Sequence, residues 1–178
     1  MDKWLILDRD GVINFDSDEF IKSPEEWMPL PGSLAAIAKL NQAGYRIVVI
    51  SNQSGLARGL FPAETLTAIH QKMIDLLSAQ EGAIEKIYFC PHGPKNDCDC
   101  RKPKSGLFER FALDYNIALT GVFAVGDSVR DLQAARAAGA LPILVKTGKG
   151  LRSLAAIEAD PSKAYADVPV YADLAHFV

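Results

Sequence analysis

Five short apolar runs, separated by segments with helical spacing, most constrain what this chain can fold into. The runs are KWLIL (3–7), YRIVVI (45–50), KIYF (86–89), GVFAV (121–125) and LPILV (141–145). Continuous apolar runs of this kind, rich in β-branched and aromatic residues, are typical of strands covered on both faces. Helical spacing is found in segments 33–43, 62–80, 105–115 and 129–138. This alternation predicts an α/β fold, a doubly wound, Rossmann-like parallel sheet with helices on both faces.

Glycines at the ends of the helical segments support the same organisation. Two helical segments end in Ala-Gly, at Gly44 and Gly139, where a glycine commonly follows the C-terminus of a helix. Residues 151–178 carry a weaker pattern, and we expect peripheral helix and turns there. A chain of 178 residues without repeats or a low-complexity linker can bury one substantial core. We therefore expect a single domain spanning residues 1–178.

The composition argues against several classes of protein. A net charge of −3 disfavours a nucleic-acid surface, which normally carries a basic excess. No apolar run approaches the ~20 residues of a membrane span. The start MDKWLILDRD returns to charge too soon for a signal peptide, and three cysteines do not suggest a disulfide framework. We expect a cytoplasmic monomer that binds neither nucleic acid nor a membrane.

Polar residues follow three of the predicted strands, in the sequences DRDG, SNQSG and VGDSVRD. In a doubly wound sheet, ligands bind beyond the carboxyl ends of the strands. Asp8 and Asp10 are two residues apart, so both can face the same side of an extended chain, and Gly11 lets the backbone turn. Each pattern taken alone also fits an ordinary strand end, or a helix N-cap at Asp127 or Ser128.

Taken together, these residues predict a site that binds a phosphoryl group. Asp8, Asp10 and Asp127 would repel one another at one edge of the sheet unless a hard cation lay between them. Mg²⁺ suits oxygen ligands of this kind. Ser51 and Lys102 add a hydroxyl and a cation, and phosphoryl transfer needs mainly alignment and charge neutralisation.

The segment CPHGPKNDCDCRKPK (90–104) holds all three cysteines and one of the three histidines. Cys90 and His92 form one close pair, and Cys98 and Cys100 form another. Three thiolates and one imidazole make a complete tetrahedral set for a structural Zn²⁺ ion, with no position left for water. The pairs are tighter than the usual C-x₂₋₄-C spacing, so free thiols beside a surface histidine remain an alternative.

Four motifs carry a resemblance to a known family. DRDGVIN, SNQSG, RKPKSG and VGDSVRDLQAA resemble the motifs of the haloacid dehalogenase-like phosphatases, over about residues 3 to 150. DRDGVIN, NQSGLARG and CDCRKP narrow the resemblance to the branch of heptose and histidinol phosphatases. It implies a haloacid dehalogenase-type fold with a minimal cap, a catalytic Mg²⁺ and a structural Zn²⁺. The implied reaction removes the C7 phosphate of D-glycero-D-manno-heptose 1,7-bisphosphate, in ADP-heptose synthesis for lipopolysaccharide.

The resemblance also implies a role for each matching residue. Asp8 would be the nucleophile that forms an aspartyl-phosphate, and Asp10 would be the general acid and base. The ligands of Mg²⁺ would be the Asp8 and Asp127 side chains and the Asp10 carbonyl, while Ser51 and Lys102 would hold phosphoryl oxygens. Contacts to the rest of the substrate would come from Asn52, Arg101, Asp16 and Glu19.

The chain departs from the family pattern at two positions. Relatives often have Thr where Ser51 stands, which keeps the hydroxyl, and some have Lys where Ser128 stands, which puts that contact in doubt. Arg58, Arg101 and Lys104 are further cations expected near the site. They favour a substrate with a second anionic group, because arginine binds phosphate in a bidentate manner.

Other functions fit parts of the pattern. A histidinol-phosphate phosphatase shares the acidic motif and the zinc loop. A phosphorelay receiver is also doubly wound, but its acceptor aspartate would stand where this chain has Ser51 and Asn52. A zinc-stabilised binding module would need no catalysis at all. We expect His70 and His176 to lie on helix surfaces without a role, and the tryptophans to serve packing.

Overall fold

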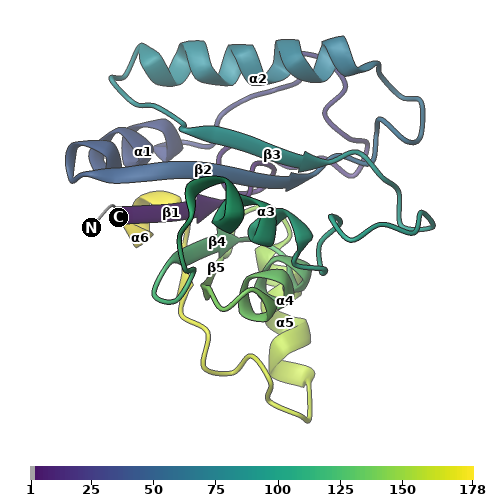
Figure 1. The fold of residues 1–178 in the computed structure, drawn as a ribbon, viewed down its shortest axis with the longest axis vertical. Helices are drawn as coiled ribbons and strands as arrows, with labels where there is room; N and C mark the ends of the chain where they lie inside the picture. Colours follow the sequence, from purple (N-terminus) through teal and green to yellow (C-terminus); the bar gives the residue numbers. More distant parts are fainter. Residues whose placement is uncertain (1–2) are drawn as a thin grey trace.

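The structure is a computed structural model that describes residues 3–178. Its strands form one six-stranded parallel sheet in the order β3-β2-β1-β4-β5-β6 (Figure 1). The strands are β1 (Lys3–Leu7), β2 (Tyr45–Asn52), β3 (Lys86–Cys90), β4 (Phe123–Gly126), β5 (Leu141–Val145) and β6 (Val170–Tyr171). The strand order reverses between β1 and β4, which is where doubly wound sheets bind their ligands.

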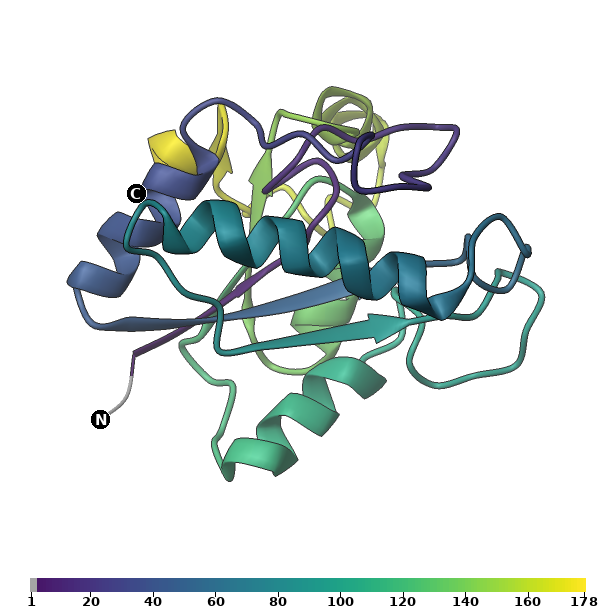
Figure 2. The same cartoon turned by 90° about the horizontal axis from the view of Figure 1, so that it is seen from above.

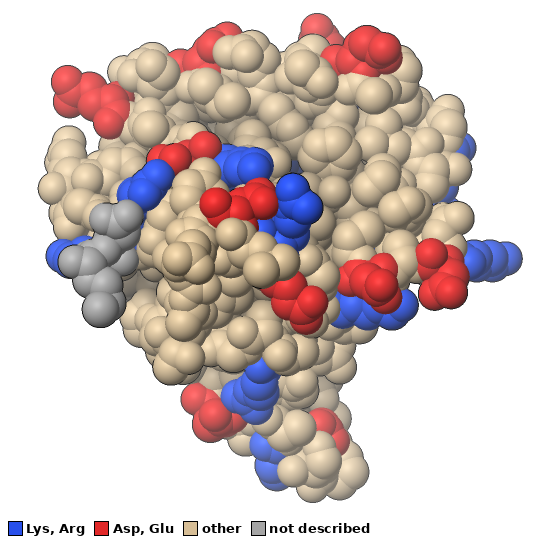
Figure 3. All heavy atoms as spheres, viewed as in Figure 1, with Lys and Arg blue, Asp and Glu red and all other residues tan. Residues whose placement is uncertain are grey.

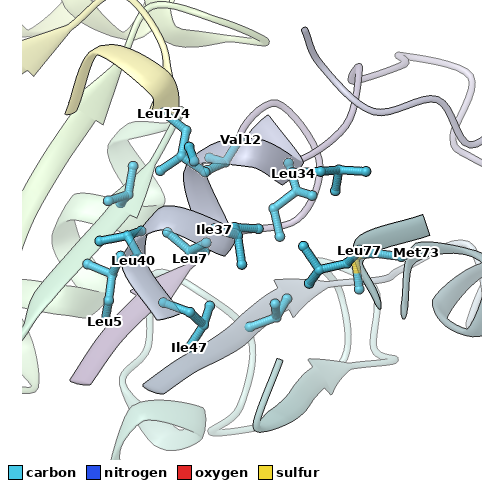
Figure 4. Packing of buried hydrophobic residues seen from close by; sticks show 14 of the residues in the cluster. Leu5, Leu7, Val12, Leu34, Ile37, Leu40, Ile47, Met73, Leu77 and Leu174 are labelled. Carbon is cyan, nitrogen blue, oxygen red and sulfur yellow. The ribbon is translucent and has the colours of Figure 1, made fainter. Parts of the chain in front are cut away.

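Helices cover both faces of this sheet. They are α1 (Ser33–Gln42), α2 (Ala63–Ser78), α3 (Gly106–Tyr115), α4 (Val129–Ala137), α5 (Gly150–Ala159) and α6 (Leu174–Phe177). Because successive strand residues point to opposite faces, Leu5 and Leu7 of β1 pack with α1, α2 and α6 in the core shown in Figure 4. Trp4 and Ile6 pack on the other face with α3 and α4. A smaller cluster joins α5 to α4 and β5.

The predicted fold class is confirmed, with one strand missed. The expected strands 3–7 and 141–145 are β1 and β5, and Gly44 and Gly139 follow α1 and α4 with φ of 85° and 82°. The missed strand is β6, which has two residues and follows a polar stretch rather than an apolar run. Trp4 and Trp27 are buried, as the packing interpretation requires.

Three loops gather at the carboxyl ends of the strands. They are residues 12–32, 53–62 and 91–104, which lie at one end of the molecule where β2 and β3 point (Figure 2). Residues 12–32 contain only turns and isolated bridges, so the described part of this insertion forms no helical cap over the site. The edge of the sheet is therefore approached through loops.

The surface charge and the character of the helices relate to the expectation that the protein binds neither nucleic acid nor a membrane. On the face drawn in Figure 3, basic and acidic side chains are interspersed between wide uncharged areas. Within residues 3–178, no helix combines the length and the apolar character needed to cross a bilayer.

Candidate active site

A cavity of about 250 Å³ lies beyond the carboxyl ends of β1, β2 and β4. It brings together seven of the predicted site residues, namely Asp8, Asp10, Asp16, Asn52, Arg101, Lys102 and Asp127. Ser51 is buried at the end of β2, outside the cavity lining, and its hydroxyl accepts a hydrogen bond from Gln53 Nε2 at 2.8 Å. Glu19 is exposed on the loop after β1, also outside the lining.

Lys102 is buried between two carboxylates. Its Nζ lies 3.1 Å from Asp8 Oδ1 and 2.6 Å from Asp131 Oδ1, and it donates to the carbonyl of Ile50 at 2.8 Å. Burial alone would lower the pKa of Lys102, but the charges of Asp131 and Asp8 raise it above its ordinary value. The ammonium group is therefore held charged beside the predicted nucleophile.

Asp131 links this lysine to the start of α4. Its Oδ2 accepts hydrogen bonds from the backbone N–H of Ser128 at 2.9 Å and of Asp127 at 3.2 Å. The Ser128 side chain in turn accepts from the Asp131 N–H, which completes a capping box. Ser128, rather than Asp127, is thus the N-cap, and the Asp127 side chain is left available to the cavity.

Two glycines make room for Asp127. A Cβ atom at Gly11 would lie 2.0 Å from Asp127 Oδ2, and one at Gly148 would lie 2.2 Å from the same oxygen. The same oxygen accepts the backbone N–H of Lys149 at 2.7 Å. Glycine is required at both positions, because both also have positive φ, 83° and 56°.

We expect Gly148→Ala to lower both stability and activity. The left-handed backbone alone costs about 1–2 kcal/mol with a Cβ atom, and the methyl group would also displace the Asp127 carboxylate. Denaturant unfolding and phosphate release measure the two effects. Gly121→Ala is the matched control, because Gly121 has φ of 83° but open space around its Cβ position. Equal behaviour of the two variants would contradict this account of Asp127.

The acidic cluster fits a hard divalent cation. One carboxylate oxygen from each of Asp8, Asp127 and Asp131 lies within 4.8 Å of the other two. Burial raises the pKa of Asp8 to about 7, with Asp131 adding to the rise and Lys102 opposing it. Burial, followed by the charges of Asp131 and Asp8, raises the pKa of Asp127 to about 8. Carboxylates destabilised in this way by one another are stabilised by a cation, and an all-oxygen donor set suits Mg²⁺.

Asp10 lies in a different environment from Asp8. Burial would raise its pKa, but the Arg9 guanidinium and hydrogen bonds from Asn14 and Gln53 lower it. Arg9 is fully buried, and its Nη1 lies 3.3 Å from His70 Nε2. The expectation that His70 lies on a helix surface is therefore wrong: the side chain is buried under the loop that carries Asp10.

The cysteines and His92 converge as the spacing predicts. The described sulfur–sulfur and sulfur–nitrogen distances run from 3.1 to 3.9 Å, and one ligand atom of each residue lies within 4.8 Å of the others. Ligands of a tetrahedral zinc site with Zn–S near 2.3 Å are separated by ~3.8 Å, so the donor set fits this ion. Burial raises the pKa of the Cys90 thiol to about 12, and the Cys100 thiol adds to the rise. Burial also raises the pKa of Cys100, whereas that of Cys98, despite some burial, is lowered by a hydrogen bond from the Arg101 backbone. A metal would therefore be needed to ionise Cys90 and Cys100.

The loop that carries the Cys/His cluster (residues 91–104) is tied to the edge of the sheet through Asn52. Its Oδ1 accepts from the Lys102 N–H at 3.0 Å and its Nδ2 donates to the Lys102 carbonyl at 3.1 Å. The Arg101 side chain donates to the carbonyl of His92 at 3.1 Å. Asn52 thus positions the backbone of Lys102, a role that its place in SNQSG did not indicate.

Several cations line the cavity. Arg58, Arg101 and Arg130 are among the lining residues, and within residues 3–178 no carboxylate pairs with any of them. Burial, followed by the charge of the nearby Arg130, lowers the pKa of Arg101. Lys104, expected here too, instead donates to the carbonyl of Cys98 and lies outside the lining.

Lys149 is a lining residue that the sequence reasoning missed. Its Nζ lies 2.6 Å from Asp16 Oδ2, which connects the loop after β1 to the loop after β5. The sequence KTGKG that follows β5 held a usable signal, because it leaves the same edge of the sheet as the three motifs already considered. Arg130 could have been found in the same way from VGDSVRD.

Comparison with known proteins places this geometry in a family. Residues 99–175 match the family model described as HAD-hydrolase-like. The chain is 57% identical over 152 residues to the D-glycero-beta-D-manno-heptose-1,7-bisphosphate 7-phosphatase of Pseudomonas putida, covering 85% of this chain and 87% of the relative. The enzyme of the same name from Bordetella bronchiseptica is 57% identical over 153 residues, covering 86% of each chain.

Solved structures agree with the sequence comparison. The crystal structure of D,D-heptose 1,7-bisphosphate phosphatase from B. bronchiseptica, complexed with magnesium and phosphate, superposes with a TM-score of 0.92 at 52% identity. It covers 98% of this chain and 95% of the relative. The corresponding Burkholderia thailandensis structure has a TM-score of 0.75 at 43% identity, with the same coverage. The chain therefore belongs to the D-glycero-beta-D-manno-heptose-1,7-bisphosphate 7-phosphatase family of haloacid dehalogenase-like hydrolases.

Proposed function

We propose that this protein is a Mg²⁺-dependent phosphatase that removes the C7 phosphate of D-glycero-D-manno-heptose 1,7-bisphosphate, on the route to ADP-heptose for lipopolysaccharide. One observation carries the proposal. The carboxylates and the buried lysine of phosphoryl transfer line one cavity, in a chain that is 57% identical to a phosphatase of that name. The B. bronchiseptica relative, solved with magnesium and phosphate, supports the same ligands.

In the first half of the reaction, Asp8 is the nucleophile. Its carboxylate oxygen attacks phosphorus while the bond from phosphorus to the C7 oxygen breaks, and Asp10 gives that oxygen a proton. Lys102, 3.1 Å from Asp8, balances the negative charge that gathers around phosphorus. The products of this half are a heptose 1-phosphate and an aspartyl-phosphate.

In the second half, water replaces the enzyme on phosphorus. Asp10 takes a proton from the attacking water, and the bond from phosphorus to the Asp8 oxygen breaks. Phosphate leaves and the Asp8 carboxylate is restored, so atoms and charge return to their starting arrangement. Asp10 thus acts once as acid and once as base. Because Arg9, Asn14 and Gln53 lower its pKa in the free protein, Asp10 must take up a proton as the substrate binds before it can give one to the leaving oxygen.

We assign the magnesium ligands to the side chains of Asp8 and Asp127 and to the carbonyl of Asp10. When bound, the ion supplies positive charge that offsets repulsion between the carboxylates and the phosphoryl oxygens. Asp131 stays with Lys102 and the start of α4. Ser51 is proposed to act on the phosphoryl group as well, because its hydroxyl accepts from Gln53 and so keeps its own O–H to donate.

The unpaired guanidinium groups favour a substrate with two phosphates. Arg58, Arg101 and Arg130 line the cavity without carboxylate partners, so they are positioned to bind an anion. Histidinol phosphate carries a cationic amine and would be repelled there. Among the remaining predicted substrate contacts, Asp16 and Asn52 line the cavity, whereas Glu19 would need the loop after β1 to move.

Zinc is proposed to hold the loop that carries Arg101 and Lys102. Its ligands would be Cys90, His92, Cys98 and Cys100, a closed set with no vacant position for substrate. The role is therefore structural, because a ligand set of this type leaves the ion no catalytic contact.

The test is a competition between substrates. Phosphate release is measured on both anomers of heptose 1,7-bisphosphate and on histidinol phosphate, with and without Mg²⁺. We expect the highest kcat/KM for a heptose bisphosphate, with a product that keeps its anomeric phosphate by NMR. A kcat/KM for histidinol phosphate that equals or exceeds this value would overturn the substrate assignment.

We expect Arg101→Ala to raise KM for heptose 1,7-bisphosphate by about tenfold or more, because a charge-assisted contact contributes about 1.5–3 kcal/mol. The change should be smaller for a substrate with one phosphate. Lys104→Ala is the matched control, since Lys104 lies nearby on the same loop but outside the cavity lining. Initial-rate kinetics on both variants decide the point, and equal effects would refute a specific role for Arg101.

A further inference from the structure

A fully buried arginine stands between the two predicted catalytic acids. Arg9 has no exposed surface, although an arginine almost never lies wholly inside a protein without specific partners. It cannot reach solvent, and its neighbours along the chain are Asp8 and Asp10. Because arginine stays protonated in proteins, a permanent positive charge lies next to both acids.

The side chain holds the carboxyl group of Asp10 with two nitrogens. Nε lies 3.0 Å from Asp10 Oδ1, and Nη2 lies 3.0 Å from Asp10 Oδ2. This is the bidentate arrangement of a planar guanidinium and a planar carboxylate, which fixes both the position and the plane of the acid. Asn14 Nδ2 and Gln53 Nε2 add one hydrogen bond to each oxygen, at 2.8 and 3.0 Å.

Two further donors of Arg9 reach two other elements. Nη2 donates to Gln53 Oε1 at 3.2 Å, on the loop after β2, and Nη1 lies 3.3 Å from His70 Nε2 on α2. An arginine can only donate, so His70 Nε2 must accept and its proton must sit on Nδ1. Burial, with the nearby guanidinium, lowers the pKa of His70 to about 4, which keeps the ring neutral and able to accept.

We propose that Arg9, held by His70 and Gln53, is a positioning residue that fixes the Asp10 carboxyl group at the cavity wall. The inference rests on the proposed function, in which Asp10 exchanges protons with the leaving oxygen and with water. Arg9 touches no reacting atom itself. It acts through Asp10, and α2 contributes to the site through one histidine.

The role predicts a dependence on the leaving group. An alkyl oxygen must be protonated as it leaves, whereas a nitrophenolate leaves readily without a proton. Loss of Asp10 alignment should therefore slow cleavage of an alkyl phosphate far more than cleavage of nitrophenyl phosphate. General damage to the fold or to phosphate binding would slow both substrates alike.

The first variant is Arg9→Lys, which keeps the positive charge but removes the two-nitrogen contact with the Asp10 carboxylate. We expect kcat/KM for heptose 1,7-bisphosphate to fall about 100-fold, the cost of misplacing a catalytic group. For nitrophenyl phosphate we expect a fall of less than about fivefold, because little acid catalysis is needed. In an Asp10→Asn background, Arg9→Lys should add little to the loss, because residues that act as a unit are not additive.

A second pair of variants tests the arrangement without touching the buried charge. His70→Leu removes the acceptor and should lower kcat/KM for the alkyl ester about tenfold, with the same selectivity. His70→Gln keeps an acceptor and should restore most of the rate. His176→Leu is the matched control on an exposed histidine. These variants decide the question even if Arg9→Lys does not fold.

Equal losses on both esters, or additive losses with Asp10→Asn, would overturn the proposal. Fructose 1,6-bisphosphate serves as a second alkyl ester, which separates this test from the substrate assignment. If the wild type cleaves it but not the heptose substrate, the proposed function fails while the leaving-group comparison still judges Arg9.

Discussion

The Asp8→Asn variant is expected to release phosphate at least about 10⁴-fold more slowly than the wild type, the scale on which removal of a nucleophile acts. An amide is a poor nucleophile, and it also removes one negative ligand from the cation site. The fold should survive, because Lys102 keeps Asp131 and the Ile50 carbonyl as partners. Phosphate release under saturating Mg²⁺, together with thermal unfolding, measures both effects.

Stability is expected to stay constant or to rise in this variant. The pKa of Asp8 is raised to about 7 by burial and nearby acids, so its ionised form destabilises the metal-free protein. Asp75→Asn, at an exposed position of α2, makes the same chemical change away from the site and keeps an oxygen that can accept from Gln71, so it should alter neither property. Near wild-type turnover by Asp8→Asn would rule out the aspartyl-phosphate route.

The second large effect concerns the zinc loop. Protein purified without added zinc should contain about one equivalent of the ion, and its three thiols should react slowly with a thiol reagent. Cys98→Ser should lose the ion and lower the melting temperature by about 5 °C or more, equivalent to roughly 2 kcal/mol in a chain of this size. Elemental analysis and calorimetry measure these two outcomes.

Catalysis should fall as well, although none of Cys90, His92, Cys98 and Cys100 lines the catalytic cavity. The loop delivers Lys102, whose backbone is held at Asn52 on one side and continues directly from the cluster on the other. His92→Ala should behave like Cys98→Ser, whereas His176→Ala should not. Protein that is fully active with substoichiometric zinc and freely reactive thiols would refute the structural role.

Much of the fold followed from hydrophobic pattern alone. β1 and β5 coincide with their apolar runs because buried parallel strands need continuous apolar residues. β2 and β3 run past theirs, to Asn52 and Cys90, because polar residues at the sheet edge still complete the backbone ladder. Pattern could not reveal β6, since two residues on an edge strand leave too short a signal.

The sequence likewise predicted only part of the candidate site. Asp8, Asp10, Lys102 and Asp127 could be placed together because a parallel sheet delivers every strand end to one edge. The contact between Arg9 and His70 could not, because it joins residues 61 positions apart through side-chain length and burial. No spacing rule predicts such a contact. In the sequence, His70 is only one polar residue within a predicted helix.

The pairing of β1 with β4 has a consequence for when the enzyme becomes active during folding. Residues before the exposed turn at Thr120 and Gly121 supply Asp8 and Lys102, and residues after it supply Asp127 and Asp131. Neither portion alone holds a complete set of acids around the lysine. The catalytic centre therefore exists only once the late-synthesised portion docks onto the early one, which makes turnover a stringent reporter of finished folding.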